Sequence, residues 1–79
     1  MQNYLSKNQL ISLYQRGDLE GVRKQLLRYG KITHDKSFDI ESGYYKGANR
    51  DINVMHHGLL WNFSMLNGEV RSLGYQIEH

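Results

Sequence analysis

The chain contains no cysteine, and none of its apolar runs reaches 18 residues. The first absence excludes disulfide bonds, thiolate metal ligands and thiol catalysis. The second excludes a transmembrane helix. The first ten residues, MQNYLSKNQL, also lack an apolar stretch typical of a signal peptide, so we expect a cytoplasmic protein that does not enter a membrane.

Motifs that carry enzymatic chemistry are also missing. The sequence has no glycine-rich phosphate loop, no serine elbow and no pair of carboxylates at catalytic spacing. A histidine and a carboxylate brought together by the fold would escape this search, because such a pair need not be close in sequence. We therefore expect a protein that is not an enzyme and that needs no cofactor.

The length of 79 residues predicts a single domain spanning residues 1–79. A domain of this size buries only a little over half of its unfolded surface, so its stability is marginal. Six tyrosines, two phenylalanines and one tryptophan are too many aromatic residues for a disordered chain. Binding to a larger partner or to a second copy would add stability.

Charge divides the chain into two parts. The net charge is only +2, but residues 1–31 carry six basic and two acidic side chains, whereas residues 32–79 carry four basic and six acidic ones. The same boundary separates a region with helical periodicity from one with strand-like alternation. We therefore predict that residues 1–31 are helical and that residues 32–79 form a β-sheet.

Two short helices are predicted before residue 31. Leu10, Leu13 and Tyr14 form an apolar stripe at i, i+3 and i+4, and Ser6 is placed to cap that helix. Gly17 interrupts the pattern, although one long helix bent at this point is an alternative.

The second helix is expected to begin after Asp18, a good N-cap residue. Leu19, Val22, Leu26 and Tyr29 then share one face. Gly30 stands where a glycine C′ residue would end the helix.

The stretch LISLYQRGDLEGVRKQLLRYG, residues 10–30, resembles the helix pair of an ankyrin repeat in its Gly-Asp turn and its closing Leu-Leu before glycine. The resemblance covers 21 of the 79 residues. The T-P-L-H signature is absent and nothing repeats at a period near 33 residues, although a solenoid needs several stacked units. The resemblance therefore implies a similar helix pair and no function.

Alternating apolar residues predict strands after residue 32. Phe38 and Ile40 alternate with polar residues, as do Ile52 and Val54, and these four even-numbered residues are assigned to one face of the sheet. The apolar residues of the last third are odd-numbered instead: Leu59, Trp61, Phe63, Met65, Leu73, Tyr75 and Ile77.

The change of parity constrains the turns, because a one-residue slip moves every side chain to the other face. A two-residue loop at His57-Gly58 sets Val54 opposite Trp61. The even-numbered apolar residues before the loop and the odd-numbered ones after it then lie on the same face of the sheet. A β-bulge at Gly58 within one long bent strand would have the same effect.

The turn between the last two predicted strands must instead place odd-numbered apolar residues of both strands on the same face. We predict a three-residue loop, Leu66 to Gly68, with Gly68 in the left-handed conformation. A loop from Asn67 to Glu69 would also keep this parity. The predicted fold is α+β: two short N-terminal helices packed on one face of a four-stranded antiparallel β-meander.

The other face of this sheet is the first candidate for a binding surface. It mixes small polar and aliphatic side chains, as protein interfaces often do, although an ordinary solvent-exposed face has a similar composition. The candidate residues on β-strand positions are Leu60, Asn62, Ser64 and Leu66, with Asn53, Met55, Val70, Ser72, Gly74 and Gln76 on the same predicted face.

The loop SGYYKGANR is the second candidate. Paired tyrosines beside cations are common in binding hot spots, and they could also stack on nucleic-acid bases. Its candidate residues are Tyr44, Tyr45, Lys46 and Arg50. The alternative is that one tyrosine packs on the core and the other has no role.

Nucleic-acid binding is the competing hypothesis. Lys24, Arg28 and Lys31 stand at i, i+4 and i+7, and such a stripe can meet phosphates, together with Lys46 and Arg50. A solvated helix face explains the same spacing, and the small net charge weakens the case.

His56 and His57 are not expected to share a metal ion, because neighbouring residues on a strand point to opposite faces. His34 and His79 have no defined place near them. The sequence therefore predicts no metal site.

These observations favour a small non-enzymatic protein-binding module. We expect an inhibitor or adaptor that blocks a surface of a larger partner. By analogy of size alone, such proteins include anti-CRISPR-like inhibitors of host defence nucleases from phages and mobile elements. The alternative is a small nucleic-acid-binding protein, and a homodimer is compatible with either.

Overall fold

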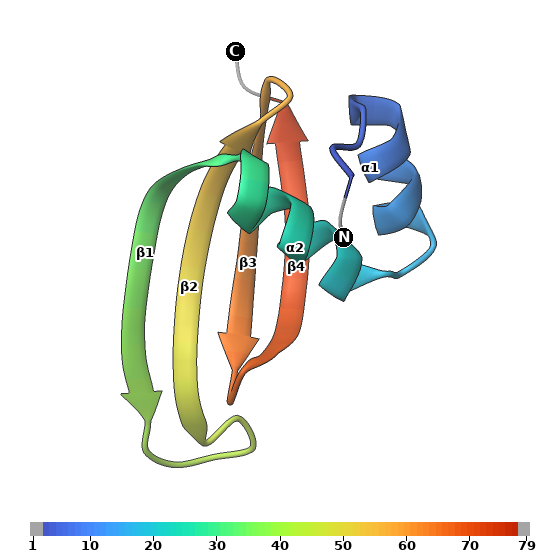
Figure 1. Ribbon diagram of the computed structural model, residues 1–79. Helices are drawn as coiled ribbons and strands as arrows, with labels where there is room; N and C mark the ends of the chain where they lie inside the picture. Colours follow the sequence, from blue (N-terminus) through green and yellow to red (C-terminus); the bar gives the residue numbers. More distant parts are fainter. Residues whose placement is uncertain (1–2, 78–79) are drawn as a thin grey trace.

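The computed structural model describes residues 3–77, and its elements follow the predicted order. Two helices precede four strands: α1 (Lys7–Gln15), α2 (Leu19–Tyr29), β1 (Lys31–Ile40), β2 (Gly47–His56), β3 (Leu59–Leu66) and β4 (Glu69–Ile77). The strands form one antiparallel sheet in the order β1-β2-β3-β4, with the helices packed on one face (Figure 1). The predicted α+β fold is confirmed.

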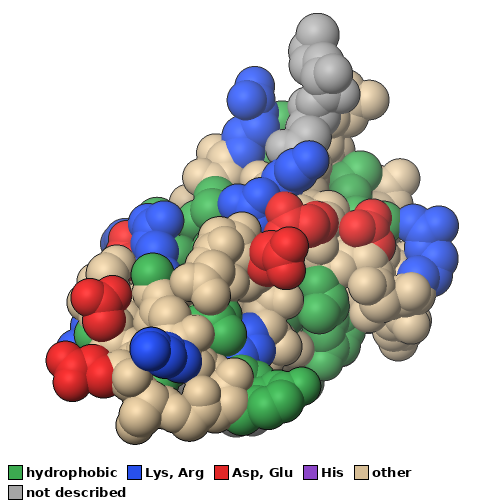
Figure 2. Space-filling view, turned by 90° about the horizontal axis from the view of Figure 1, so that it is seen from below, with side chains coloured by type: hydrophobic (Ala, Val, Ile, Leu, Met, Phe, Trp, Pro, Cys, Tyr) green, Lys and Arg blue, Asp and Glu red, His purple; other side chains and the backbone are tan. Residues whose placement is uncertain are grey.

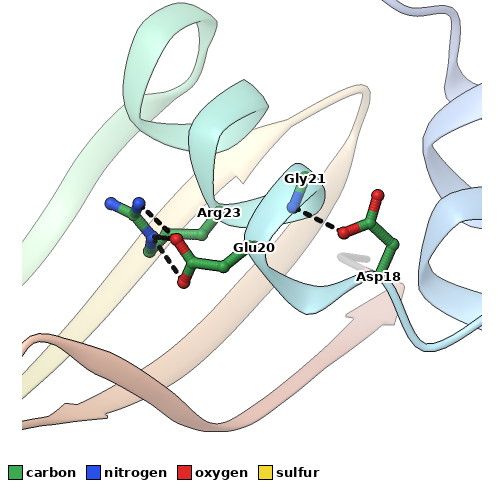
Figure 3. Close-up of polar contacts among 4 residues, drawn as sticks. All are labelled: Asp18, Glu20, Gly21 and Arg23. Carbon is green, nitrogen blue, oxygen red and sulfur yellow. Dashed lines mark hydrogen bonds and ion pairs between the residues drawn. The ribbon is translucent and has the colours of Figure 1, made fainter.

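Side-chain caps separate the two helices as expected. The hydroxyl of Ser6 accepts a hydrogen bond from the backbone N–H of Gln9, and the Gln9 side chain accepts one from the N–H of Ser6, which makes a capping box. Gly17 adopts a left-handed φ of 81° between the helices. Asp18 then accepts from the N–H of Gly21 at 3.1 Å and caps α2 (Figure 3).

Gly30 ends α2 in a different way from the one predicted. It has an extended backbone, with φ −84° and ψ 171°, and is the C-cap residue that leads directly into β1. A β-carbon at this position would clash with Val54 and would lie 2.7 Å from the carbonyl oxygen of Leu26. Glycine is therefore needed because the end of α2 approaches β2 closely.

The core lies between the helices and one face of β2, β3 and β4. Trp61 is fully buried at its centre, and its indole N–H donates to the carbonyl oxygen of His56 at 3.1 Å. The other buried apolar residues are Leu10, Val22, Leu26, Ile52, Val54, Leu59, Phe63 and Met65.

The first hairpin follows the prediction. His57 and Gly58 form a two-residue turn with φ values of 55° and 72°, as a type I′ turn requires. Val54 consequently lies opposite Trp61, and Ile52 lies opposite Phe63.

The second hairpin has a two-residue turn, so the predicted three-residue loop is wrong. Asn67 and Gly68 have φ values of 52° and 85°, and β3 pairs with β4 directly from Leu66 and Glu69. Gly68 is left-handed as predicted. Asn-Gly strongly favours a two-residue type I′ turn. The turn is therefore short, and the register of β4 is not set by a longer loop.

A β-bulge restores the parity that this short turn would have broken. The register shifts between Ser64 and Met65, so that Arg71 is the extra residue on β4. Beyond it Leu73 lies opposite Phe63, as predicted. Val70, however, pairs with the buried Met65 on the helix side, so its predicted place on the outer face is wrong.

The assignment of β1 to the core is also wrong. Phe38 pairs with Asn49 and Ile40 pairs with Gly47, which places both apolar residues on the face opposite to Ile52. The cause is the even number of residues in the loop 41–46, which sets even-numbered residues against odd-numbered ones. Phe38 is 41% exposed and almost all of β1 lies outside the core.

Among residues 3–77 no helix is both long and apolar enough to cross a membrane.

The close approach of α2 to β2 gives a first prediction. We expect Gly30→Ala to lower the free energy of unfolding by about 1–3 kcal/mol, because the added methyl overpacks the contact with Val54. Gly74→Ala is the matched control, since its β-carbon would lie no closer than 3.6 Å to any atom, at Asn62 Oδ1. Urea unfolding followed by tryptophan fluorescence measures both, and equal stabilities of the two variants would contradict the prediction.

The bulge gives a second prediction. Deleting Arg71 alone leaves the pairs on both sides of the bulge in one continuous register, so we expect cooperative folding with Leu73 still in the core. Deleting Arg71 and Ser72 together turns Leu73 and Tyr75 outward, so we expect the cooperative transition to be lost. Near-ultraviolet circular dichroism and thermal unfolding distinguish the two deletions, and loss of folding in the single deletion would refute the role of the bulge.

Candidate functional site

The side of the sheet that faces away from the helices is the candidate surface, here called the outer face. Leu60, Asn62, Ser64 and Leu66 of β3 all lie on it, opposite residues of β2 and β4. Asn62 is exposed and the other three are half-buried. The helices pack against the opposite face, so this side is open.

A polar network crosses the centre of the outer face. The Asp51 carboxylate accepts a hydrogen bond from the Ser64 hydroxyl at 2.7 Å and another from the Asn49 side chain at 3.0 Å. These two bonds, the one from Ser64 first, lower the pKa of Asp51 below its usual range. Asn49 is only 3% exposed, so the network is built into the sheet.

The bulge aims Arg71 at the same network. Its guanidinium reaches Asn49 Oδ1 at 3.4 Å and lies over the ring of Tyr45, 4.8 Å from the ring centroid. The residue that corrects the register of β4 therefore also ties the loop 41–46 to the outer face.

The tyrosines of that loop border a cleft of about 360 Å³ against the β3–β4 turn. Tyr44 is 94% exposed and Tyr45 is 47% exposed, and their rings meet edge to face at 5.1 Å. Leu66, Glu69 and Arg71 also line the cleft. An aromatic, aliphatic and charged wall of this kind suits a side chain from another protein.

Lys46 is exposed in the same loop, whereas Arg50 is not part of this surface. Arg50 lies on the helix side of β2 and pairs with Asp35 of β1 through two hydrogen bonds of 2.9 and 2.7 Å. The hydrogen bond from Arg50 lowers the pKa of Asp35. The sequence placed Arg50 with the tyrosines because the two are close along the chain, but strand parity separates them.

The predicted basic stripe is not one surface. Lys24 and Arg28 are exposed on α2, and the Arg28 side chain donates to the Tyr29 hydroxyl at 3.1 Å. The helix ends at Tyr29, so Lys31 belongs to β1, where it pairs with Met55 on the outer face. The i, i+4, i+7 spacing does not place the three basic residues on one helix face, because the last of them is in a strand.

The rings of His56 and His57 approach one another, so the expectation that their side chains point to opposite faces is wrong. His57 occupies the turn and not the strand, and its ring centroid lies 4.0 Å from that of His56. Burial, followed by the charge of His57, lowers the pKa of His56. No three His, Asp or Glu side chains gather at metal-binding distance in the part of the chain described. His79 lies outside the described residues.

Charges of both signs surround the loop end of the molecule. Figure 2, viewed from the end where the β1–β2 loop lies, shows hydrophobic side chains exposed between basic and acidic ones. A surface with mixed charges is less typical of phosphate binding than a continuous basic patch.

Scans of the chain against protein-family models, curated protein sequences and solved structures gave no match. Its function is therefore inferred from the geometry of its surface.

The network at Asp51 gives a third prediction. We expect Ser64→Ala to raise the pKa of Asp51, because the shortest hydrogen bond to its carboxylate is lost. Because the folded-state pKa is lowered, the associated stabilisation is present at neutral pH and is lost as pH falls through the folded-state value. Ser64→Ala should therefore weaken the loss of stability on acidification.

A carboxyl-detected NMR titration measures this pKa directly. Asn62→Ala is the matched control, because Asn62 shares the strand and the face of Ser64, whereas the side-chain hydrogen bonds to the Asp51 carboxylate come from Ser64 and Asn49. An unchanged Asp51 pKa in Ser64→Ala would contradict the assignment.

Proposed function

We propose that this chain is a non-enzymatic protein-binding module that covers a surface of a larger partner with its outer face and the tyrosine loop 41–46. The observation that carries the proposal is the cleft beside Tyr44, whose side chain is 94% exposed at the end of an open sheet face. An aromatic side chain left so exposed gains apolar contacts when a partner covers it.

The composition of the surface supports a protein partner. Leu60 and Leu66 are half-buried aliphatic residues, and Asn62 and Ser64 between them offer hydrogen bonds without net charge. Tyr and Arg are enriched in protein interfaces. Tyr44, Tyr45 and Arg71 at one end would supply the anchoring contacts.

The rigidity of the surface also favours this function. The outer face is built on paired strands, and Asn49 and Asp51 hold its polar centre through hydrogen bonds. A surface ordered before binding loses less conformational entropy when a partner docks. A small domain of this design acts by occupying a site, as an inhibitor or adaptor does. An inhibitor of a host defence nuclease from a phage or mobile element is the specific version of this role, by analogy of size alone.

Nucleic-acid binding is the competing outcome. The case for nucleic-acid binding is weaker because Arg50 is paired with Asp35, and because Lys31 lies on a different surface from Lys24 and Arg28. Phosphate contacts make affinity fall steeply with salt, whereas a largely apolar protein interface is much less sensitive.

The experiment is affinity capture from a host lysate with and without nuclease treatment, followed by mass spectrometry and binding measurements on the recovered protein. We expect a protein that survives nuclease treatment and binds with little salt dependence. The double variant Tyr44→Ala/Tyr45→Ala should weaken its affinity by about 30-fold, the effect of losing a hot spot, without lowering the thermal stability of the domain.

Lys24→Ala/Arg28→Ala is the control, since both residues are exposed and lie on α2, away from the outer face. Unchanged binding by the tyrosine variant would remove the loop from the interface. If only nucleic acid is recovered, and the Lys24→Ala/Arg28→Ala variant no longer recovers it, the result would favour nucleic-acid binding.

A further inference from the structure

Residues 3–5, here called the strap, run in front of α1 and are fastened to α2 and to the turn at His57. Gln25 of α2 is only 3% exposed and holds the strap at two points. Its side-chain nitrogen donates to the carbonyl oxygen of Asn3 at 2.6 Å, and its side-chain oxygen accepts from the backbone N–H of Leu5 at 3.1 Å. His57 Nε2 donates to the carbonyl oxygen of Leu5 at 2.9 Å. Three hydrogen bonds therefore fix this segment.

Tyr4, in the middle of the strap, brings its ring to two histidines. The ring centroid lies 5.4 Å from that of His57 and 5.8 Å from that of His56, both edge to face. On its other contact the ring meets Tyr29 of α2 at 5.0 Å. The strap is thus part of the surroundings of His56.

His56 is a buried titratable residue with an unsatisfied ring atom. Its side chain is 9% exposed, and Nε2 has no hydrogen-bond partner among the residues that the structure describes. A neutral imidazole can keep Nε2 as its acceptor nitrogen, whereas both nitrogens of the charged imidazolium are donors. A proton on Nε2 would therefore add a buried positive charge whose N–H has no acceptor, which is strongly unfavourable.

The neighbours of His56 do not compensate such a charge. Among residues 3–77 the ion pairs are those of Arg23 with Glu20 and of Arg50 with Asp35, so neither histidine has an acidic partner there. The strand position opposite His56 on β3 is the apolar Leu59. The titratable side chains in contact with His56, or next to those contacts, are neutral or cationic: Tyr4 of the strap, His57 of the turn, Tyr29 and Arg28 at the end of α2, and Lys31 on the outer side of β1.

The strap is the part of these surroundings that can move without opening the core. Asn3 and Tyr4 are exposed and Leu5 is half-buried, whereas α2, β2 and β3 carry the fully buried Leu26, Val54 and Trp61. Water can replace the three hydrogen bonds of the strap when it leaves. Segments with few buried contacts open locally before the whole domain unfolds.

We propose that acidification releases the strap: protonation of His56 frees residues 3–5 from α2 and the turn, while α2 and the sheet stay folded. Burial and the charge of His57 lower the pKa of His56 in the docked form below the usual 6.5. Docking is therefore strongest above about pH 6.5 and weakens as pH falls below it. Each pH unit raises the ratio of released to docked chains by up to about tenfold, until the docked His56 itself titrates. The proposal does not depend on what the outer face binds.

Hydrogen exchange of the Leu5 amide tests the release, because this N–H is bonded to Gln25 in the docked form. We expect its protection factor, corrected for the intrinsic exchange rate, to fall by up to about tenfold from about pH 7.5 to about pH 5.5. It should also stay below the protection factor of the Phe63 amide in the central strand β3 at each pH. Equal protection of Leu5 and Phe63 throughout would show that the strap opens only when the whole domain unfolds, and would overturn the proposal.

His56→Phe should remove most of this pH dependence, because its ring fills the same place without titrating. His34→Gln and His79→Gln are the controls and should keep the pH dependence, since the first changes an exposed histidine of β1 and the second a histidine outside the described residues. The same fall in Leu5 protection in a folded His56→Phe variant as in the unaltered chain overturns the role of His56.

The reciprocal effect gives a test that keeps His56 in place. If protonation releases the strap, loosening the strap must make protonation easier. Gln25→Leu removes both bonds to α2, so we expect lower Leu5 protection and titration of His56, followed by NMR, at a pH closer to the 6.5 of an exposed histidine.

Gln15→Leu makes the same substitution at an exposed position of α1, whereas the strap is held by Gln25 and His57, so it is the matched control and should change neither quantity. Titration of His56 at the same pH in Gln25→Leu as in the unaltered chain overturns the proposal, whether or not Leu5 protection falls.

Discussion

Strict alternation of side chains across the sheet is the constraint on which the rest of this structure depends. The core requires the apolar residues of β2, β3 and β4 to face the helices together, although those of β2 are even-numbered and those of β3 and β4 are odd-numbered. A two-residue turn joins the first pair of strands, and a two-residue turn with a compensating bulge joins the second. Together, the two turns and the bulge place the apolar residues of all three strands on the helix side, with Trp61 at the centre of the core.

The same bulge links stability to the candidate surface. If the same sequence paired with β3 without the bulge, Leu73 and Tyr75 would face away from the helices. With it, Arg71 projects from the outer face onto Asn49 and the ring of Tyr45. The contacts that Arg71 makes with Asn49 and with Tyr45 of the loop 41–46 thus depend on the same bulge that completes the core.

The helices cover only part of the sheet, and this limited coverage leaves the surfaces that the protein has available for binding. Both faces of β1 are open, and its helix side carries the ion pair between Asp35 and Arg50 in place of an apolar layer. Exposed ion pairs of this kind contribute little to stability, so the fold depends on the core that β2, β3 and β4 form with the two helices. The outer face is consequently free to meet other molecules.

The sequence alone determined the number, type and order of the elements, the two helix caps and the His57-Gly58 turn, because each depends on local periodicity or on residues close together in the chain. It also identified Leu60, Asn62, Ser64 and Leu66 as one face of β3. Only the tertiary structure decided where β1 lies relative to the core. It also decided that a two-residue turn at Asn67-Gly68 is combined with a bulge at Arg71. Finally, it placed Arg50 and Lys31 on different surfaces from the candidate residues that are close to them in sequence. These features depend on pairing between strands, in which a single residue of offset reverses a face, and no local pattern records that offset.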